Sequence, residues 1–416
     1  MIFILIWRNY IYNRLYYRSQ PAREEEKEDH DNIFMQQLVS PHWYNASSII
    51  VVFGNCLLPI QILFGDHQLN PDTGDPYLFG MFCALCHAFI GALFLLNILI
   101  DGCIFIVRKI LEWGKMQQFQ VLMMQLGKKT HRLRAPVTFL LSAKIVLGGA
   151  MIAMEDPVVV KITVPIRQLP ESLDNFRIIQ LSDLHIGVSV GRSRVERAVK
   201  IVNGLCSEPK NGSKCDLVAL TGDVIDGEPY HLMAAIEPFR HLVPGKSTSK
   251  LFVAGNHEHI HQNVDHVIEV LSDLGIDSIV NESIRLPKKN PRKKQLVVVG
   301  FDDLSSRQSR GKEQHSLFDG TEPGKDTIVL LAHQPNHLKV AQRHGVDLML
   351  SGHTHAGQFF PGTLGAWLLN AKFSGYYPSE ETAVYVSAGT HWWGPPVRYT
   401  TRHHEITDIR LIKSTE

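Results

Sequence analysis

The sequence predicts an α/β domain preceded by a helical transmembrane region. The first 155 of its 416 residues hold three long runs with almost no charge, and the later residues alternate short β-rich apolar runs with amphipathic stretches. Several of the apolar runs also end in Asp, Asn or His. A helix needs about 20 apolar residues to cross a bilayer. Strands that alternate with helices are typical of βαβ units with a largely parallel sheet.

Residues 1–42 are expected to form a loosely ordered N-terminal tail. The apolar start, Met1–Trp7, is too short to span a membrane and lacks the basic flank of a signal peptide. A tyrosine-rich and then highly charged stretch follows it. Such composition buries too little apolar surface to fold by itself.

Residues 43–155 are expected to form a transmembrane region of about three helices. Residues 43–65 carry no charge, and a second uncharged run, 77–100, continues past Asp101 to residue 107. The third run, 136–154, has one charge, Lys144, which would have to snorkel or line a helix contact. Buried helices of a soluble domain are the alternative, and three runs of this length disfavour it.

The loops between these runs predict the orientation. The link between the second and third runs is basic, whereas the link between the first and second has no Lys or Arg. The basic residues are Arg108, Lys109, Lys115, Lys128, Lys129, Arg132 and Arg134. Basic loops favour the cytoplasm, so three crossings place the chain after Met154 in a lumenal or extracellular compartment. Sequons at Asn211 and Asn281, and a disulfide between Cys206 and Cys215, would be compatible with that side.

Composition disfavours several other classes of protein. The net charge of +1 gives no argument for a nucleic-acid partner. The six cysteines form no zinc-ribbon pattern, and the pair Cys83 and Cys86 lies between apolar residues, which favours buried small side chains over a metal site. Asp101 and Lys144 are too few intramembrane charges to favour a channel or transporter.

Residues 156–416 are expected to form the catalytic domain. Its β-rich runs are 158–164, 176–181, 217–220, 251–254, 296–299, 328–331, 348–350 and 384–386. Helices are predicted at 192–205, 230–242 and 264–274, where apolar residues recur at helical spacing. Ligands collect at the carboxyl ends of strands in such sheets, so the residues that follow these runs are the candidates for a site.

Five of the runs end in side chains that can bind metal or carry a proton. In chain order these are Asp183 and His185, Asp223 and Asp226, Asn256 with His257 and Glu258, His333, and finally His353 and His355. A single Asp after glycine is usually a turn or a cap, and a single His is usually a satisfied surface or core residue. Five strands with such ends in one domain are poorly explained in that way.

The side chains predict a centre with two metal ions. Carboxylate and amide oxygens with imidazole nitrogens suit Mn, Fe or Zn, and no thiolate is present to favour a softer ion. Seven candidate ligands are too many for one ion with an open position. They suit two ions about 3.5–4 Å apart that share a carboxylate and bridge a hydroxide. This arrangement is typical of phosphoester hydrolysis.

The ordered set DxH, GDxxD, GNHE, H and GHTH, within roughly residues 160–410, resembles the calcineurin-like metallophosphoesterase family. The resemblance implies a two-sheet sandwich flanked by helices. It also implies that Asp183, His185 and His355 hold one metal ion, that Asn256, His333 and His353 hold the other, and that Asp223 bridges both. His257 would contact the phosphate and protonate the leaving group, oriented by Glu258, with Asp226 behind the ligands.

We therefore expect a membrane-anchored, multi-pass phosphoester hydrolase with two divalent metal ions, a phosphodiesterase in preference to a phosphatase. Its partners would be the membrane and a phosphoester substrate, with a lipid as one option. The alternative is a membrane-anchored scaffold that kept the fold and lost turnover. The presence of every ligand position and of His257 disfavours the scaffold.

Two aromatic stretches near the predicted site have more than one interpretation. Residues 358–378 are unusually apolar for a loop beside a polar site. Packing against the domain's own core is the favoured interpretation, and contact of Phe359, Phe360, Trp367, Leu368 and Leu369 with the bilayer is the alternative. Residues 391–394, His-Trp-Trp-Gly, are expected to form a wall of the pocket.

Overall fold

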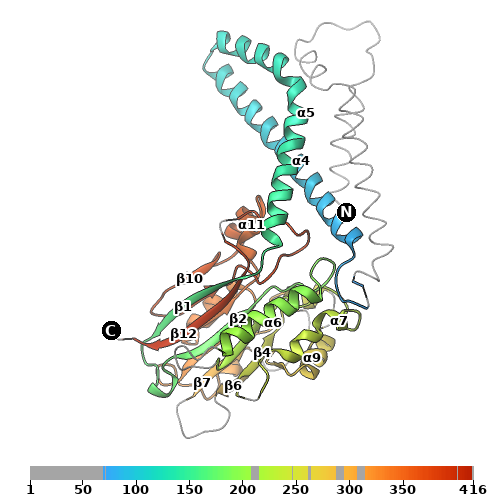
Figure 1. The fold of residues 1–416 in the computed structure, drawn as a ribbon. Helices are drawn as coiled ribbons and strands as arrows, with labels where there is room; N and C mark the ends of the chain where they lie inside the picture. Colours follow the sequence, from blue (N-terminus) through green and yellow to red (C-terminus); the bar gives the residue numbers. More distant parts are fainter. Residues whose placement is uncertain are drawn as a thin grey trace. The chain divides into compact units, whose positions relative to one another are not determined.

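The computed structural model describes residues 69–414, apart from 71, 208–214, 246, 261–263, 287–294, 307–313 and 401. The predicted tail, the first predicted span and the sequon at Asn211 lie outside the described residues. The chain divides into two compact units (Figure 1). One contains Cys86–Val146, and the other contains Leu63–Leu85 together with Leu147–Glu416.

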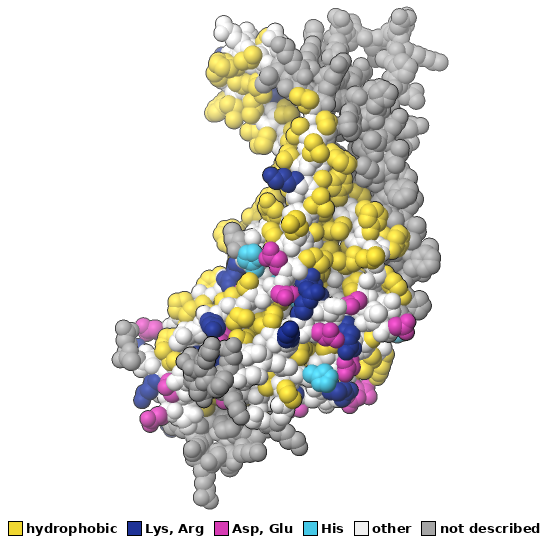
Figure 2. Space-filling view, viewed as in Figure 1, with side chains coloured by type: hydrophobic (Ala, Val, Ile, Leu, Met, Phe, Trp, Pro, Cys, Tyr) yellow, Lys and Arg dark blue, Asp and Glu magenta, His cyan; other side chains and the backbone are white. Residues whose placement is uncertain are grey.

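Two long helices account for the second and third apolar runs. They are α4 (Leu78–Trp113) and α5 (Gln117–Ala153). Among the described residues, the segments long and apolar enough to cross a membrane are Leu78–Trp113 and Pro136–Ala153. Figure 2 shows a surface of mostly hydrophobic side chains over these helices. Both segments are therefore candidate membrane spans.

The basic link between the two runs is not a separate loop. It comprises the end of α4, a short turn at residues 114–116, and the first half of α5. Within this helical pair, Arg134 lies 2.8 Å from the carboxylate of Asp101 and also donates to the side chain of Asn97. Asp101, one of the two predicted intramembrane charges, is therefore paired with a cation.

The larger unit contains two six-stranded sheets, which confirms the predicted sandwich. The first has the strand order β1, β12, β2, β3, β4, β5, and the second has the order β10, β11, β9, β8, β7, β6. The strands of the first sheet are β1 (Val158–Ile166), β12 (Glu405–Lys413), β2 (Phe176–Leu181), β3 (Leu217–Thr221), β4 (Ser249–Val253) and β5 (Asp277–Ser278). Those of the second are β10 (Gly375–Tyr377), β11 (Ala383–Val386), β9 (Leu348–Ser351), β8 (Thr327–Leu331), β7 (Leu296–Gly300) and β6 (Glu282–Leu286).

Each sheet is mixed, with a parallel centre. Strands β2, β3, β4 and β5 are parallel, and so are β7, β8, β9 and β11. Strand β12 runs antiparallel to β2, and β6 and β10 are antiparallel to their neighbours. Within each sheet the parallel strands have their carboxyl ends on the same side. The candidate site lies at these carboxyl ends.

The two sheets pack face to face. Alternate side chains along a strand point to opposite faces, so Ile178 of β2 joins the core between the sheets and Ile179 joins the core beneath the helices. Val329 and Leu350 of the second sheet also belong to the inner core. Both faces of each sheet are therefore covered, and this explains why most of the strand sequences are largely apolar.

Helices cover both outer faces. The first sheet is covered by α6 (Arg192–Ser207), α7 (Met233–Ile236) and α9 (Val264–Asp273). On the second sheet lies α10 (Leu338–Arg343), while α8 (Asn256–Ile260) and α11 (Gly362–Leu369) follow ligand-bearing strand ends. The prediction of a single helix at 230–242 was wrong. The segment consists of short 3₁₀ and α turns, and Pro238 inside it lacks the N–H that a continuous helix would need.

The ends of the two long helices pack on this larger unit. The carboxylate of Asp75, just before α4, accepts hydrogen bonds from the backbone N–H and the hydroxyl of Ser193. In the last turns of α5, the carbonyl of Gly149 accepts from the N–H of Arg398, and a Cβ at Gly149 would lie 2.6 Å from Val397. The start of α4 and the end of α5 are therefore both attached to the same folded unit.

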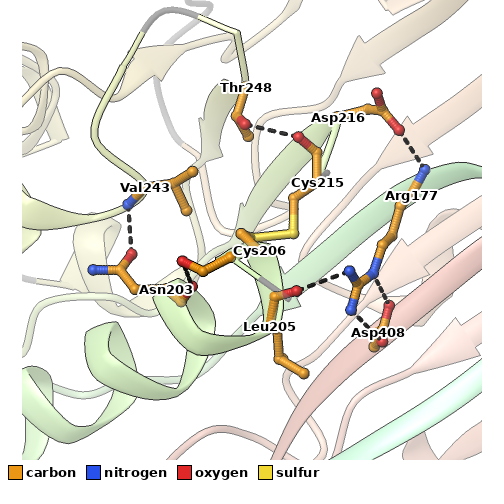
Figure 3. The surroundings of a disulfide bond; sticks show 10 residues. Arg177, Asn203, Leu205, Cys206, Cys215, Asp216, Val243, Thr248 and Asp408 are labelled. Atoms are coloured by element: carbon orange, nitrogen blue, oxygen red, sulfur yellow. Dashed lines mark hydrogen bonds and ion pairs between the residues drawn. A yellow bond between two sulfur atoms is a disulfide. The ribbon is translucent and has the colours of Figure 1, made fainter. Parts of the chain in front are cut away.

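A disulfide and a buried ion pair connect elements of the first sheet and its covering helix α6 (Figure 3). Cys206 at the end of α6 is bonded to Cys215 just before β3, so the predicted pairing is present in the structure. Arg177 of β2 makes two 2.8 Å hydrogen bonds to the carboxylate of Asp408 in β12. A planar guanidinium that binds both carboxylate oxygens is the strongest form of such a pair.

Candidate metal centre

The structure brings all seven predicted ligand residues to one place. They follow the carboxyl ends of β2, β3 and β4 in the first sheet and of β8 and β9 in the second. Three overlapping groups of donors lie close enough to hold ions: Asp183 with His185 and His355; His185 with Asp223 and His257; Asp223 with His333 and His353. Because the donors come from both sheets, the sandwich itself assembles the site.

Most of these residues have a left-handed backbone. The φ angles are 54° at Asp183, 49° at His185, 51° at Asp223, 70° at His353 and 50° at His355. For a residue with a Cβ this conformation costs roughly 1–2 kcal/mol. Strained backbone of this kind clusters at functional sites, where the surrounding structure holds it in place. Here it turns the side chains inward immediately after each strand.

The neighbouring glycines leave no room for a side chain. A Cβ at Gly352 would collide with the hydroxyl of Ser182 and the carboxylate of Asp183. At Gly222, whose φ is +85°, a Cβ would lie 2.5 Å from Nδ1 of His333. These positions need glycine because the ligand loops pass directly against each other.

One set of donors faces the first candidate ion position. Nε2 of His355 lies 2.8 Å from Nε2 of His185 and 3.4 Å from Oδ1 of Asp183. Oδ2 of Asp223 lies 3.8 Å from Nε2 of His185. The other oxygen of Asp183, Oδ2, is buried and has no hydrogen-bond partner among the described residues.

A second set surrounds the same oxygen of Asp223. Oδ2 of Asp223 lies 3.1 Å from Nε2 of His333. Oδ1 of Asn256 lies 3.2 Å from that nitrogen and 2.8 Å from Nδ1 of His353, and the two nitrogens are 3.3 Å apart. Asp223 therefore stands between the two sets, in the position that the resemblance assigns to a bridging ligand.

The spacing fits a pair of divalent ions. A metal–nitrogen distance of about 2.1 Å places two neighbouring ligands of one ion roughly 3.0–3.4 Å apart. Most of the donor separations in both sets lie near this range. In addition, several lone pairs face one another at these distances, and hydrogen bonds alone would not require that arrangement. The donors are carboxylate and amide oxygens and imidazole nitrogens, which fits Mn, Fe or Zn without selecting one.

Hydrogen bonds orient two of the imidazole rings. Nδ1 of His333 lies 2.8 Å from the carbonyl of Thr221, and Nδ1 of His185 lies 3.0 Å from the carboxylate of Asp226. A proton on each Nδ1 leaves Nε2 with a lone pair that faces the donor sets. Fixing the tautomer of a ligand histidine in this way raises its basicity and its affinity for metal.

Asp226 also contacts the predicted general acid. Its Oδ1 lies 2.6 Å from Nδ1 of His257, while Nε2 of His257 lies 4.0 Å from Oδ2 of Asp223. The His257 ring is therefore held between a carboxylate on one side and the donor sets on the other. Trp393 packs edge-on against this ring at 5.7 Å.

The prediction that Glu258 orients His257 was wrong. Its two carboxylate oxygens accept hydrogen bonds from four backbone N–H groups, those of Asp223, Val224, Ile225 and Gly255, at 2.7–3.2 Å. The sequence places Glu258 beside His257, but the turn at the start of α8 points the two side chains to different partners. Glu258 instead joins the loops after β3 and β4, and Asp226 contacts His257.

The carboxylates and imidazoles perturb one another's pKa strongly. Burial opposes the ionisation of Asp223, but His333, His185 and His257 lower its pKa well below the usual value. Burial also disfavours a charged His185, but Asp226 and the other carboxylates raise its pKa to about 9. Burial and the neighbouring His333 lower the pKa of His353 to about 4.

The other two residues of the first donor set also have shifted pKa values. Burial, His185 and Arg398 lower the pKa of His355. Burial raises the pKa of Asp183, and Asp223 adds to this while His333 opposes it. Metal binding requires the neutral imidazole and the ionised carboxylate, so an ion held here would displace the proton that His185 favours and keep Asp183 ionised.

The sequence interpretation missed Arg398. Its buried guanidinium donates to the backbone carbonyls of His355 and Ala388, and burial lowers its pKa to about 10. An isolated Arg in an irregular segment carries no motif that would have identified it. Of the predicted aromatic wall, Trp393 lies beside His257, whereas Trp392 is buried and donates to Ser189.

Known proteins match this chain in sequence. A family model described as calcineurin-like phosphoesterase matches residues 176–357, which include every candidate ligand. Two similar proteins are named "Transmembrane protein with metallophosphoesterase domain". The one from Danio rerio is 36% identical over 66% of this chain and 62% of its own length. The one from Bos taurus is 33% identical over 81% of this chain and 74% of its own length. An "Uncharacterized metallophosphoesterase" of Helicobacter pylori is 32% identical over 60% of this chain and 65% of its own length. The chain therefore spans less than two thirds of the Danio rerio and Helicobacter pylori relatives.

Proposed function

Because this chain belongs to the calcineurin-like phosphoesterase family, we propose that it is a membrane-anchored hydrolase that cleaves phosphodiesters with two divalent metal ions. One observation supports this most directly. Oδ2 of Asp223 lies between two sets of oxygen and nitrogen donors, each spaced as the ligands of one ion would be. In this proposal Asp183, His185 and His355 hold one ion, Asn256, His333 and His353 hold the other, and Asp223 bridges them.

The ions, when bound, would neutralise the phosphoryl oxygens and lower the pKa of a water molecule. The chain's own residues provide the remaining functions. Asp226 and the carbonyl of Thr221 fix the rings of His185 and His333, so that their Nε2 atoms face inward. Glu258 holds the loops that carry Asp223 and Asn256 together through its bonds to their backbone. Such fixed geometry is the main contribution of a protein to phosphoryl chemistry.

His257 would act as the general acid. Its Nε2 faces the donor sets, and Asp226 at Nδ1 stabilises the protonated ring. A water oxygen would attack phosphorus and lose a proton to solvent while the ester P–O bond breaks. The leaving alcohol oxygen would take the proton from His257, and His257 would regain one from solvent. Proton transfer by a positioned side chain typically contributes 10²–10⁴-fold to a rate.

Membrane anchoring and orientation form part of the proposal. We retain residues 43–155 as the transmembrane region and 156–416 as the catalytic domain. Asp75, which precedes α4, bonds to Ser193 of the larger unit, so both ends of the helical pair lie on one side of any membrane that it crosses. The basic turn would lie on the other side, which the positive-inside tendency assigns to the cytoplasm.

The disulfide supports a lumenal or extracellular catalytic domain. Cys206 and Cys215 are bonded, and disulfides persist mainly in oxidising compartments. The sequon at Asn281 gives no such support. Asn281 is 8% exposed, and its side-chain oxygen accepts from the N–H of Asp302, so the folded protein has no room for a glycan there.

The test uses the full chain in detergent with a nitrophenyl phosphodiester and added Mn²⁺. We expect wild-type turnover, its abolition by Asp223→Ala and by Asn256→Ala, and loss of bound metal from both variants by elemental analysis. Tyr230→Ser, which alters an exposed aromatic residue among charged neighbours, serves as a control and should retain activity. Equal absence of turnover in wild type and both variants, with metal still bound, would favour the scaffold alternative.

A further inference from the structure

The helix α11 (Gly362–Leu369) exposes large apolar side chains. None of its residues is buried. Leu364, Trp367, Leu368 and Leu369 are 48%, 61%, 63% and 77% exposed, and Phe359 and Phe360 just before the helix are 36% and 53% exposed. We call these six residues the apolar rim. The favoured expectation that this stretch packs into the domain's own core was therefore wrong for α11. A continuous exposed apolar surface marks a site of interaction.

The apolar rim is attached to two ligand loops. Thr363 in the first turn of α11 packs against Gly357, two residues after His355. At the other end, the side chain of Asn336 accepts from the N–H of Ala371 and donates to the carbonyl of Leu369. Asn336 lies three residues after His333. The rim is therefore joined directly to two loops that carry candidate ligands.

The end of α5 indicates where a membrane surface would lie. Residues up to Ala153 belong to the apolar segment Pro136–Ala153, and the first charged residue after it is Glu155. Leu147 and Met151 in the last turns are 62% and 74% exposed, while Ala153 packs with Val190 and Trp392 of the larger unit. The parts of this unit that touch these turns therefore lie at the level where a span would leave the bilayer.

A short series of contacts connects these turns to the apolar rim. The N–H of Arg398 donates to the carbonyl of Gly149, and the next residue, Tyr399, donates from its N–H to the carbonyl of Gln358. Gln358 directly precedes Phe359 and also bonds to the carbonyl of Trp393. In Figure 1, α11 lies on the side of this unit where α5 ends.

Exposed aromatic residues line the same connection. Tyr399 is 55% exposed and Trp393 is 53% exposed. Aromatic residues with a polar group are enriched at membrane–water interfaces, since the ring is apolar and the polar group stays hydrated. The surface between the end of α5 and the rim therefore has the composition of an interfacial belt.

We propose that the apolar rim inserts into the bilayer surface and that the substrate is a membrane lipid with a phosphoester head group. This inference rests on the proposed hydrolase function and specifies its substrate class. The rim is joined to the loops that carry His333 and His355, so a lipid whose acyl chains stay in the membrane would bring its phosphate toward these donors. Apolar residues of a helix that lies in the interface are stabilised there by burial among the acyl chains.

The first experiment compares two substrates that differ in one chain. Both are nitrophenyl phosphodiesters; one carries a long alkyl chain that anchors it in nanodiscs, and the other carries a methyl group and stays in solution. For the full chain in nanodiscs, Trp367→Ser with Leu368→Ser should lower kcat/KM for the anchored substrate at least about tenfold. Activity on the methyl substrate should not change.

Tyr230→Ser is the matched control, because Tyr230 is an aromatic residue with 51% exposure whose hydroxyl and ring contact Glu269 and His266. It should leave both rates unchanged. Equal rates of the double variant and wild type on the anchored substrate would overturn the inference. The methyl substrate tests the hydrolase itself, since its hydrolysis does not depend on the rim.

The second experiment measures contact without turnover. Nanodiscs with brominated acyl chains should quench tryptophan fluorescence of wild type more than that of Trp367→Phe, and the difference gives the signal of Trp367. An unquenched Trp367 would overturn the inference even for an active enzyme. If neither substrate is hydrolysed and Asn256→Ala changes nothing, the proposed function fails, while quenching still decides whether the rim contacts lipid.

Discussion

Asp226 and Glu258 occupy adjacent places in the site but act on different atoms. Asp226 contacts the imidazoles of His185 and His257, whereas Glu258 accepts from four backbone N–H groups. Changing Asp226 should therefore alter chemistry at a ligand and at the general acid. Changing Glu258 should alter the loops that hold the ligands.

We predict that Asp226→Asn lowers kcat about 10²–10³-fold with little change in stability, because an amide no longer stabilises a protonated His257. Glu258→Gln should lower the free energy of unfolding by about 2–4 kcal/mol, since the amide group would face backbone donors that it cannot accept from. Thermal unfolding of the full chain in detergent, together with kcat, separates the two effects. Loss of kcat in Glu258→Gln at unchanged stability would contradict this division.

A partly buried carboxyl away from the site should make stability depend on pH. Burial raises the pKa of Asp347 to about 6, although its carboxylate accepts a hydrogen bond from the N–H of Ile328. The folded-state pKa lies above the unfolded value of 3.8, so the stability that the neutral group contributes is full below about pH 4 and is lost as the pH rises through about 6.

Asp347→Asn should remove this dependence. We expect the variant to match wild type near pH 4 and to exceed its free energy of unfolding by about 1–3 kcal/mol near pH 8. Denaturant unfolding at the two pH values gives the free energy of unfolding of the variant minus that of wild type. The contributions of the other ionisable groups cancel in this difference. A variant that is less stable than wild type near pH 8 would show that the bond to Ile328 outweighs the cost of burial.

At the scale of the elements, the disulfide joins the end of α6 to the start of β3. It closes a short loop, since Cys206 and Cys215 have a sequence separation of nine. Cross-linking a loop of this size restricts the unfolded chain and should contribute about 2–3 kcal/mol. Replacing both cysteines with serine should lower the free energy of unfolding by that amount.

The control for this prediction is reduction of the native protein. Wild type with a thiol reductant should unfold at the same denaturant concentration as the double variant, and Cys103→Ser should behave as wild type. If the reductant leaves the wild-type transition unchanged, the bond does not form in the folded protein. Such a result would also remove the support that the disulfide gives to an oxidising compartment.

The elements that the sequence predicted well are strands with apolar residues on both faces. Phe176–Leu181 was predicted with its observed bounds, since Ile178 faces one core and Ile179 and Leu181 face the other, although Arg177 and Gln180 lie between apolar residues. Strand β12 (Glu405–Lys413) was missed, since Thr407 and Asp408 interrupt its pattern. Asp408 is buried there only because Arg177 pairs with it, and no local pattern reports a partner 231 positions away.

The candidate site was predictable to a different extent. Strand tips that carry Asp, Asn and His pointed to the seven candidate ligand residues together, because parallel strands end at one edge of a sheet. The orientation of the side chains was not predictable. Glu258 follows His257 in sequence, yet the turn at the start of α8 directs the Glu258 carboxylate toward the backbone of the loop after β3. The exposure of α11 was not predictable from its composition, since an apolar helix is equally suited to a core or to a bilayer.

At the scale of the whole molecule, the two ends of the helical pair determine the topology. Asp75 before α4 and Gly149 near the end of α5 are both bonded to the larger unit. An arrangement in which one helix of the pair crosses and the other does not would separate these contacts. Residues 72–77 and the part of the chain that follows α5 must therefore share a compartment, whichever one it is.

Glycosylation identifies that compartment. In animal cells, we predict a glycan at Asn211 and none at Asn281, because Asn281 is buried and its side chain bonds to Asp302. Removal of glycans by an endoglycosidase should increase the mobility of wild type and of Asn281→Gln, and should leave Asn211→Gln unchanged. A sequon appended after Glu416 provides a second reporter on the same domain, since β12 ends at Lys413. Absence of a glycan at both Asn211 and the appended sequon would place the domain in the cytoplasm, and the basic turn between α4 and α5 would then violate the positive-inside tendency.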